Sequence, residues 1–144
     1  MEMGSILERL NTALGQLYEN ESRLIQNHAN EETIATHFAG YLKSLFIQNG
    51  WNVDACYNRD GADPKKDSRD NLILPDIIVH HQSSGIPRFS PENNLVAIEI
   101  KGHWNRDDRN IDVERLKNLK ERYGYQYVFQ IELNEESGEI IAVR

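Results

Sequence analysis

Apolar residues recur at intervals of three and four along the first third of the chain, which is the spacing of a helix with one apolar face. Within residues 5–26 they are Ile6, Leu7, Leu10, Ala13, Leu14, Leu17, Tyr18 and Ile25. A second helix is predicted from Asn30, a residue favoured as a helix cap, to about Gln48, with Asn49-Gly50 suited to end it. The first helix is expected to pack on the domain or to form a dimer seam.

Further along, short apolar runs alternate with polar stretches, which is typical of strands. Five strands are predicted, over residues 51–57, 72–80, 95–101, 125–133 and 139–143. An amphipathic helix that ends at Gly124 is predicted between the third and fourth strands. Its apolar positions are Ile111, Leu116, Leu119 and Tyr123. Residues 58–71 and 82–94 are rich in Gly, Pro and polar residues and are expected to be loops.

This order of elements predicts an α/β fold in a single domain that spans residues 1–144. The strand–helix–strand succession after residue 95 implies a right-handed crossover and a partly parallel sheet. We therefore expect a mixed central sheet of about five strands flanked by helices. Residues 1–28 would form an extra amino-terminal helix, residues 30–133 the core, and residues 134–144 an edge hairpin strand.

The balance of charge limits the function classes. A formal net charge of −7 argues against a protein that coats nucleic acid by general electrostatic attraction. Residues 1–50 carry 3 basic and 6 acidic side chains, and residues 125–144 carry 1 and 4. Residues 51–124 are nearly balanced, with 12 basic and 13 acidic side chains. A local site for a polyanion in the middle of the chain therefore stays open.

Cysteine usage and hydropathy narrow the picture further. The single Cys56 cannot form an internal disulfide, and no cysteine pair has zinc-site spacing, so a metal ion would be held by oxygen or histidine ligands. Oxygen ligands favour magnesium or manganese. No apolar stretch of membrane-spanning length and no secretory leader are visible, so we expect a cytoplasmic protein that does not bind membranes.

Charged residues at the ends of two apolar runs suggest chemistry. In the third predicted strand, Glu99 and Lys101 lie on the same face, roughly 7 Å apart along the strand. Pro75-Asp76 opens the preceding strand, so Asp76 can present a second carboxylate to one metal ion. A plainer interpretation is that the strand simply surfaces there. The same spacing in Asp63-Pro64-Lys65 lies in a predicted loop without a strand to support it.

Glu31, at the start of the second predicted helix, is a further candidate. It precedes Phe38 by seven residues and Leu45 by fourteen, which puts it on the apolar face, whereas Glu32 turns towards solvent. Glu31 can therefore face the same site as the strand residues. The alternative is that it only complements the helix dipole.

These residues occur in the order helix with Glu31, strand, strand opening Pro75-Asp76, strand closing Glu99-Ile100-Lys101, helix, strand. Over residues 30–133 this resembles the PD-(D/E)xK nuclease superfamily, with its restriction-endonuclease-like fold, and in particular its small stand-alone members. The resemblance implies a metal-dependent endo- or exonuclease that hydrolyses phosphodiester bonds. The expected partner is nucleic acid, in the form of DNA. The order of the short motifs carries this resemblance, not any one of them.

The resemblance also implies roles for individual residues. Asp76, Glu99 and the main-chain carbonyl of Ile100 would bind Mg²⁺, for which Mn²⁺ can substitute. Lys101 would position the attacking water and help to deprotonate it, and Glu31 would aid water or metal placement. Cellular roles in DNA repair or in defence against foreign DNA are consistent with it.

Neighbouring residues are candidates for contact with nucleic acid. His103 and Trp104 follow Lys101 and can stack on bases, or Trp104 can cover the core. Basic residues in the flanking loops can meet phosphates. They are Arg59, Lys65, Lys66, Arg69, Arg106 and Arg109. Of His80 and His81, only His80 shares the face of Asp76, where a hydrogen-bonded strand-end histidine is expected.

Two other functions stay open. The chain can be a catalytically silent module of the same fold that forms a homodimer or docks on a larger complex through its first helix, which would suit its acidic charge. A carboxylate-pair hydrolase acting on sugars is a third alternative, although the chain lacks clear aromatic sugar platforms.

Overall fold

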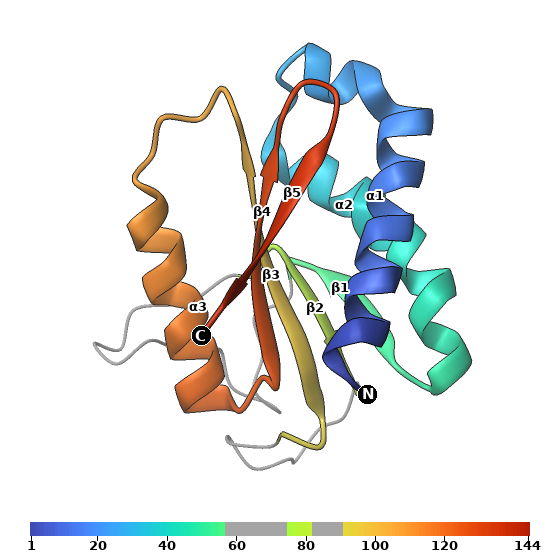
Figure 1. Cartoon of the computed structure of the whole chain (residues 1–144), viewed down its shortest axis with the longest axis vertical. Coiled ribbons are helices and arrows are strands. Elements are labelled where there is room, and N and C mark those ends of the chain that lie inside the picture. The colour runs from blue at the N-terminus through green and yellow to red at the C-terminus, as the bar shows by residue number, and fades with distance from the viewer. Residues whose placement is uncertain (57–74, 82–90) are drawn as a thin grey trace.

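The computed structural model describes residues 1–56, 75–81 and 91–144. In chain order the elements are α1 (Met3–Gln26), α2 (Glu31–Phe46), the short 3-10 helix η1 (Ile47–Asn49), β1 (Asn52–Ala55), β2 (Ile77–His80), β3 (Asn94–Gly102), α3 (Arg109–Tyr123), β4 (Tyr127–Leu133) and β5 (Gly138–Val143). Helices α1 and α2 cover one face of the sheet and α3 covers the other (Figure 1). The predicted α/β fold with a mixed sheet is confirmed.

The five strands of the sheet are ordered β1-β2-β3-β4-β5. Neighbouring strands are antiparallel except β3 and β4, which are parallel and are joined through α3. Strand β3 is therefore central, and it is buried from Leu95 to its end. Strand β2 begins at Ile77, later than predicted, so Pro75 and Asp76 lie just before its first paired residue. Residues 72–74 of the predicted strand lie outside the described residues.

The helix ends follow the local signals in the sequence. The side chain of Asn30 accepts a hydrogen bond of 2.8 Å from the amide of Glu32, as expected of a cap at the start of α2. Gly50 follows η1 with φ 80°, and Gly124 follows α3 with φ 73°. These left-handed conformations favour glycine, because a side chain would be strained there.

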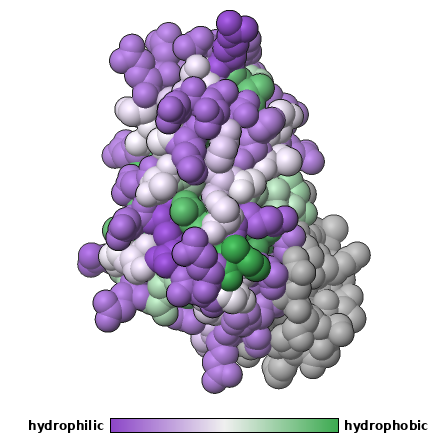
Figure 2. Space-filling model, turned by 90° about the vertical axis from the view of Figure 1, so that its right-hand side faces the viewer, coloured by the Kyte–Doolittle hydropathy of each residue, from purple (hydrophilic) through white to green (hydrophobic). Residues whose placement is uncertain are grey.

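The apolar stripe of α1 is buried within this chain, against α2 and the sheet. Its buried residues are Ile6, Leu10, Ala13, Leu14, Leu17 and Ile25. The outer surface on the side of α1 and α2 is mostly hydrophilic, with small separate apolar patches (Figure 2). The stripe therefore packs on the domain and does not supply the dimer seam that was the other expectation.

Helix α3 departs from its predicted apolar face at one position. Ile111, expected on the buried side, is 52% exposed, whereas Asp112 is only 1% exposed and lies with Leu116, Leu119 and Tyr123 on the buried side. The prediction for Ile111 is wrong because residues 112, 116, 119 and 123 share one face of the helix, whereas Ile111 lies five residues before Leu116 and points away from that face. Within the described part of the chain, no helix combines the length and apolar character needed to cross a membrane.

Candidate active site

The site is built where β3 extends beyond β2. The last pairing between the two strands joins Ile77 to Ile98, and β3 continues to Gly102. Beyond the last pair, side-chain carboxylates replace β2 as the acceptors of hydrogen bonds from the β3 amides. Asp76 Oδ2 accepts a hydrogen bond of 2.7 Å from the amide of Ile100, and Glu31 Oε2 accepts one of 2.7 Å from the amide of Gly102. Two acids from remote parts of the chain are thus fastened to the end of one strand.

The main chain holds Asp76 from its other side as well. The amide of Cys56, at the end of β1, donates to the carbonyl of Asp76 over 2.9 Å. Burial raises the pKa of the Cys56 thiol, and the charges of Glu32, Asp76 and Glu99 raise it further, so this thiol lies in an acidic neighbourhood. Asp76 is therefore fixed between two strands although no strand of its own begins until the next residue.

Asp76 and Glu99 form a carboxyl pair. They occupy the next cross-strand position after Ile77 and Ile98, where like charges repel. Burial raises the pKa of Glu99 well above its ordinary value, and the charge of Asp76 and a hydrogen bond between the two carboxyls raise it further. Burial also raises the pKa of Asp76, although the hydrogen bonds from Glu99 and from the Ile100 amide oppose this. Burial thus disfavours the charged forms of both carboxyl groups, and their mutual contact disfavours the charge of Glu99 further.

This donor set consists of oxygen atoms, the kind of ligand that a hard divalent cation prefers. Glu99 is 4% exposed, and its Oε1 atom has no hydrogen-bond partner among the described residues. Within the same ranges no group of three His, Cys, Asp or Glu side chains is placed to hold a metal. Two carboxylates and a main-chain carbonyl are nevertheless a common protein contribution to Mg²⁺, which keeps several of its waters. Asp76, Glu99 and the carbonyl of Ile100 are the groups that would bind it.

Gln130 on β4 is a neighbour of this pair that the sequence did not single out. It lies beside Glu99 in the parallel register of β3 and β4, and it is 4% exposed. Its Nε2 atom has no hydrogen-bond partner among the described residues. Buried polar atoms are rarely left unpaired, so this atom and Oε1 of Glu99 have capacity for a further hydrogen bond, to water or to another polar group. The only signal in the sequence was a polar residue inside an apolar strand.

Lys101 lies on the α3 side of the sheet. Its Nζ atom is 3.1 Å from Oδ2 of Asp112, and the two side chains are 11% and 2% exposed. Lys101 is also close enough for its charge to lower the pKa of Asp76. The ammonium therefore pairs with a third buried acid and lies within electrostatic reach of Asp76. The sequence analysis missed this acid because Asp112 looked like an ordinary first-turn residue of a helix.

Both carboxylate oxygens of Glu31 are engaged. Besides the Gly102 amide, the side chain of Asn105 donates to Glu31 Oε1 over 2.8 Å. The charge of Glu31 raises the pKa of Asp76, so it also lies within electrostatic reach of the pair. In this arrangement Glu31 ties the start of α2 to the end of β3 and to the loop that follows. This is consistent with a positioning role.

The loop after β3 carries an aromatic cluster. Trp104 stacks on His28 with ring centroids 4.6 Å apart, and His103 meets both rings edge-on at 5.2 and 5.4 Å. His103 and His28 are exposed, and Trp104 is partly buried against the core of the α1–α2 side. A Cβ atom on Gly102 would lie 2.4 Å from the Trp104 ring, so only glycine lets the ring lie on the strand end.

The candidate phosphate contacts divide into three groups. Arg106 is exposed in the loop after β3. Arg109, in contrast, makes a two-pronged ion pair with Glu132 at 2.8 and 3.0 Å and donates to the Gly102 carbonyl at 3.2 Å, so it clamps the loop to the sheet. Arg59, Lys65, Lys66 and Arg69 lie outside the described residues, as does the alternative motif Asp63-Pro64-Lys65.

The two strand-end histidines serve local structure. His80 is buried, and its Nε2 atom is 2.7 Å from Oδ2 of Asp54 on the neighbouring strand. His81 stacks on Trp51 with centroids 3.9 Å apart. The expectation of a hydrogen-bonded His80 agrees with this contact. Both residues lie at the opposite end of β2 from Asp76, so neither joins the carboxyl pair.

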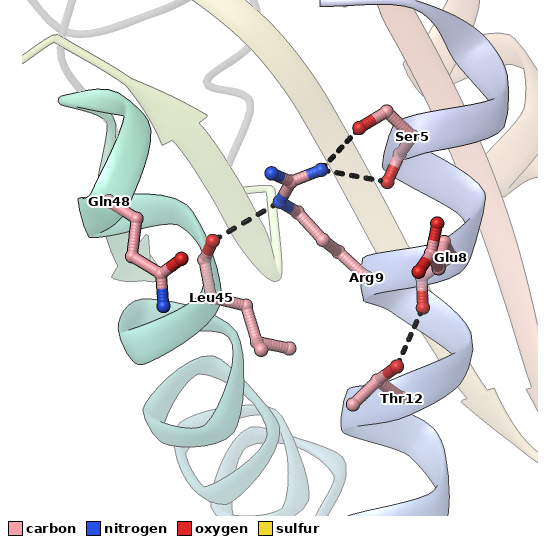
Figure 3. Close-up of a pocket in the computed structure, with 6 residues that line it drawn as sticks. All are labelled: Ser5, Glu8, Arg9, Thr12, Leu45 and Gln48. Carbon is pink, nitrogen blue, oxygen red and sulfur yellow. Dashed lines mark hydrogen bonds between the residues drawn. The ribbon is translucent and has the colours of Figure 1, made fainter.

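A separate pocket of about 290 Å³ lies between α1 and α2 (Figure 3). Its one cation, Arg9, is already used within the protein: Nε donates to the Leu45 carbonyl over 3.1 Å, and other donors reach Ser5 and Asn49. Leu45 is fourteen residues along α2 from Glu31, a distance of about 20 Å on a helix. This pocket is therefore not part of the site at the end of β3.

Comparison with known proteins gives a structural alignment and no match by sequence. No family model matches this chain, and no curated protein matches it. It aligns with a chain in the cryo-EM structure of a DrdV–DNA complex at a TM-score of 0.47 and 13% identity. The alignment covers 99% of this chain and 12% of that chain. This protein thus corresponds in length to a small part of the larger one.

Proposed function

We propose that this protein is a Mg²⁺-dependent nuclease with a restriction-endonuclease-like core, and that it hydrolyses phosphodiester bonds of DNA. The observation that carries the proposal is the buried Asp76–Glu99 carboxyl pair, with Lys101 on the same strand within electrostatic reach. Two neighbouring buried carboxyl groups are costly in a structural role, because burial and mutual repulsion both disfavour their charged forms. They are favourable where a divalent cation is to be held.

Each group then has a task in the reaction. Asp76, Glu99 and the Ile100 carbonyl would hold the cation. When bound, Mg²⁺ would supply positive charge to the phosphodiester oxygens and lower the pKa of a coordinated water. The Lys101 ammonium would orient that water or a phosphate oxygen. Glu31 would keep the end of β3 and the following loop in place through its two hydrogen bonds.

The loop that follows β3 is the proposed contact with DNA. His103 and Arg106 are exposed directly after Lys101, and the Trp104–His28 stack stands beside them. Aromatic rings bind unpaired bases by stacking, worth about 1–3 kcal/mol per base. An arginine nearby adds attraction for phosphate. These contacts would bring a polyanion to a protein whose net charge is −7 despite the general repulsion.

The alternative of a silent interaction module has less support. It was expected to dimerise or dock through the first helix, and the apolar stripe of that helix is buried against the rest of the chain. A module without chemistry would also have no use for a buried, mutually repelling carboxyl pair.

A cleavage assay tests the proposal. Purified protein is incubated with linear, circular, branched and single-stranded DNA, with Mg²⁺, with Mn²⁺ or with a chelator. We expect cleavage only with a metal ion. Asp76→Ala and Lys101→Ala should each lower the cleavage rate at least about 100-fold. Mutating a group that only orients a metal ligand already costs up to about 100-fold in activity.

Glu121→Ala, which removes an exposed acid near the far end of α3, is the matched control and should cleave at the unchanged rate. Cleavage that survives in both site variants would show that a contaminant is responsible. DNA binding without cleavage in any metal would instead support the silent module.

A further inference from the structure

Asp112 is placed where the packing of α3 calls for an apolar side chain. Positions 112, 116, 119 and 123 share one face of the helix, and the other three are Leu116, Leu119 and Tyr123, all at most 1% exposed. Asp112 is itself 1% exposed. Replacing a buried ion pair by well-packed apolar residues is often neutral or stabilising. Stability alone therefore does not explain an aspartate at this position.

The helix dipole does not explain it either. An acid in the first turn is worth about 0.3–1 kcal/mol through the dipole, whereas burying an ion costs several kcal/mol. The start of α3 is already capped, since the side chain of Asp108 accepts a hydrogen bond of 2.9 Å from the Asn110 amide. A capping or dipole role would be served as well by an exposed acid.

The contacts of Asp112 point to Lys101. Oδ2 lies 3.1 Å from Lys101 Nζ, and Oδ1 lies 3.7 Å from the exposed Arg115. The 3.1 Å contact with Oδ2 engages one side of the ammonium. Because an ammonium carries three N–H donors, others are left for a water or a phosphate oxygen.

The frame around this ion pair is rigid. Arg109, at the start of α3, is clamped to Glu132 on β4 and to the Gly102 carbonyl on β3. Asn105, in the connecting loop, is bonded to Glu31. The helix and the strand that carry the two partners are therefore held at a set separation.

We propose, on the basis of the nuclease function above, that Asp112 is a positioning residue that holds the Lys101 ammonium beside the Asp76–Glu99 pair. A lysine side chain has many rotamers, and ordering it costs conformational entropy. The ion pair with the buried carboxylate orders the lysine side chain before substrate binds, so this entropy is not lost during the reaction. Asp112 itself touches neither the substrate nor the cation.

The test compares Asp112→Asn with Asp112→Glu and with Glu114→Gln, a control that removes the charge of an exposed acid on the same helix. We expect Asp112→Asn to lower kcat about 100-fold, the cost of roughly an ångström of misplacement, with KM for DNA unchanged. Mn²⁺ affinity, measured by calorimetry, should also be unchanged. Asp112→Glu keeps the charge and should retain most of kcat, and Glu114→Gln should match the unaltered protein.

A second measurement needs neither metal nor activity. Acetylation of Lys101 in the metal-free protein is followed by mass spectrometry, with the exposed Lys117 and Lys120 as internal references. Loss of the ion pair in Asp112→Asn should speed labelling of Lys101 and leave the references unchanged. If Asp112→Asn is poorly folded, Asp112→Glu decides the matter instead. In that variant the charge is kept, so acetylation of Lys101 should stay slow relative to the reference lysines.

Unchanged kcat in Asp112→Asn, or unchanged labelling of Lys101, would overturn the inference while leaving the nuclease function intact. A loss of Mn²⁺ affinity equal to the loss of kcat would also overturn it, because Asp112 would then be a ligand. If the unaltered protein cleaves no DNA with any metal, the nuclease function and this inference fall together.

Discussion

The two faces of the central sheet bury different kinds of side chain. On the side of α1 and α2, the buried cluster among the described residues is apolar and is centred on residues such as Phe38, Phe46 and Phe129. On the side of α3, a smaller apolar cluster shares the interior with charged and amide groups. Those groups are Glu99, Lys101, Asp112 and Gln130.

The difference between the two faces suggests that the α1–α2 side supplies most of the stability, whereas the candidate site lies on the α3 side. Apolar burial supplies most of the free energy of folding, and the α1–α2 side has more of it. The α3 side carries buried polar groups, whose burial is costly unless each is paired or hydrogen-bonded. Glu31 joins the two, since it starts a helix of the apolar side and bonds to the strand end at the site.

Phe38→Ala should have the largest effect on stability. Phe38 is fully buried on the α1–α2 side, and truncating a buried phenylalanine costs about 3–5 kcal/mol. Urea titration followed by circular dichroism measures the free energy of unfolding. Ile47→Ala, at a position 54% exposed, is the control and should change little. A similar loss in both variants would contradict the view that this side supplies the stability.

Gly102→Ala tests the point where the two sides meet. The added Cβ would lie 2.4 Å from the Trp104 ring, and forcing an extra carbon into a packed contact costs about 1–3 kcal/mol. The ring should move away from Gly102, which tryptophan fluorescence in a Trp51→Phe background would detect.

The matched control is Gly15→Ala on α1, where a Cβ would meet nothing within 4 Å. This change should stabilise by roughly 0.5–1 kcal/mol, because alanine is the better helix former. If Gly102→Ala is equally harmless and leaves the fluorescence unchanged, the close packing of Trp104 on the strand end is refuted.

Glu99→Gln should have the smallest effect and the opposite sign. The pKa of Glu99 is raised in the folded protein, so the folded state binds the proton more tightly than the unfolded state does. Stability therefore falls as pH rises from about 4.5, the ordinary value, towards the raised pKa. Glutamine carries no charge at any pH and removes this loss.

At neutral pH and without metal, Glu99→Gln should raise Tm, because the charge that burial and Asp76 disfavour is removed. The gain should shrink as pH falls towards 4.5. Glu135→Gln, at an exposed site, should show neither effect. A Tm of Glu99→Gln below that of the unaltered protein at neutral pH would show that Glu99 is not under electrostatic strain.

Much of the architecture was readable from local patterns. Periodic apolar residues predicted α1, α2 and α3, and Asn30, Gly50 and Gly124 marked their ends, because caps and left-handed turns depend on single residue types. Apolar runs predicted the strands, and β3 was placed to within a residue of its end. The start of β2 was placed too early, since pairing with β3 decides where a strand begins.

The order of Glu31, Asp76, Glu99 and Lys101 along the chain was also legible, because each residue sits at the end of a recognisable element. Their roles stay predictions. Helical spacing alone puts Asp112, and not Ile111, on the face of Leu116 and Leu119. What the chain could not disclose was the ion partner of Asp112, the neighbouring Gln130, or the capture of both Glu31 oxygens. Periodicity places a side chain on a face, but only the packing of α3 against β3 brings two charges within 3.1 Å and makes burial of one favourable.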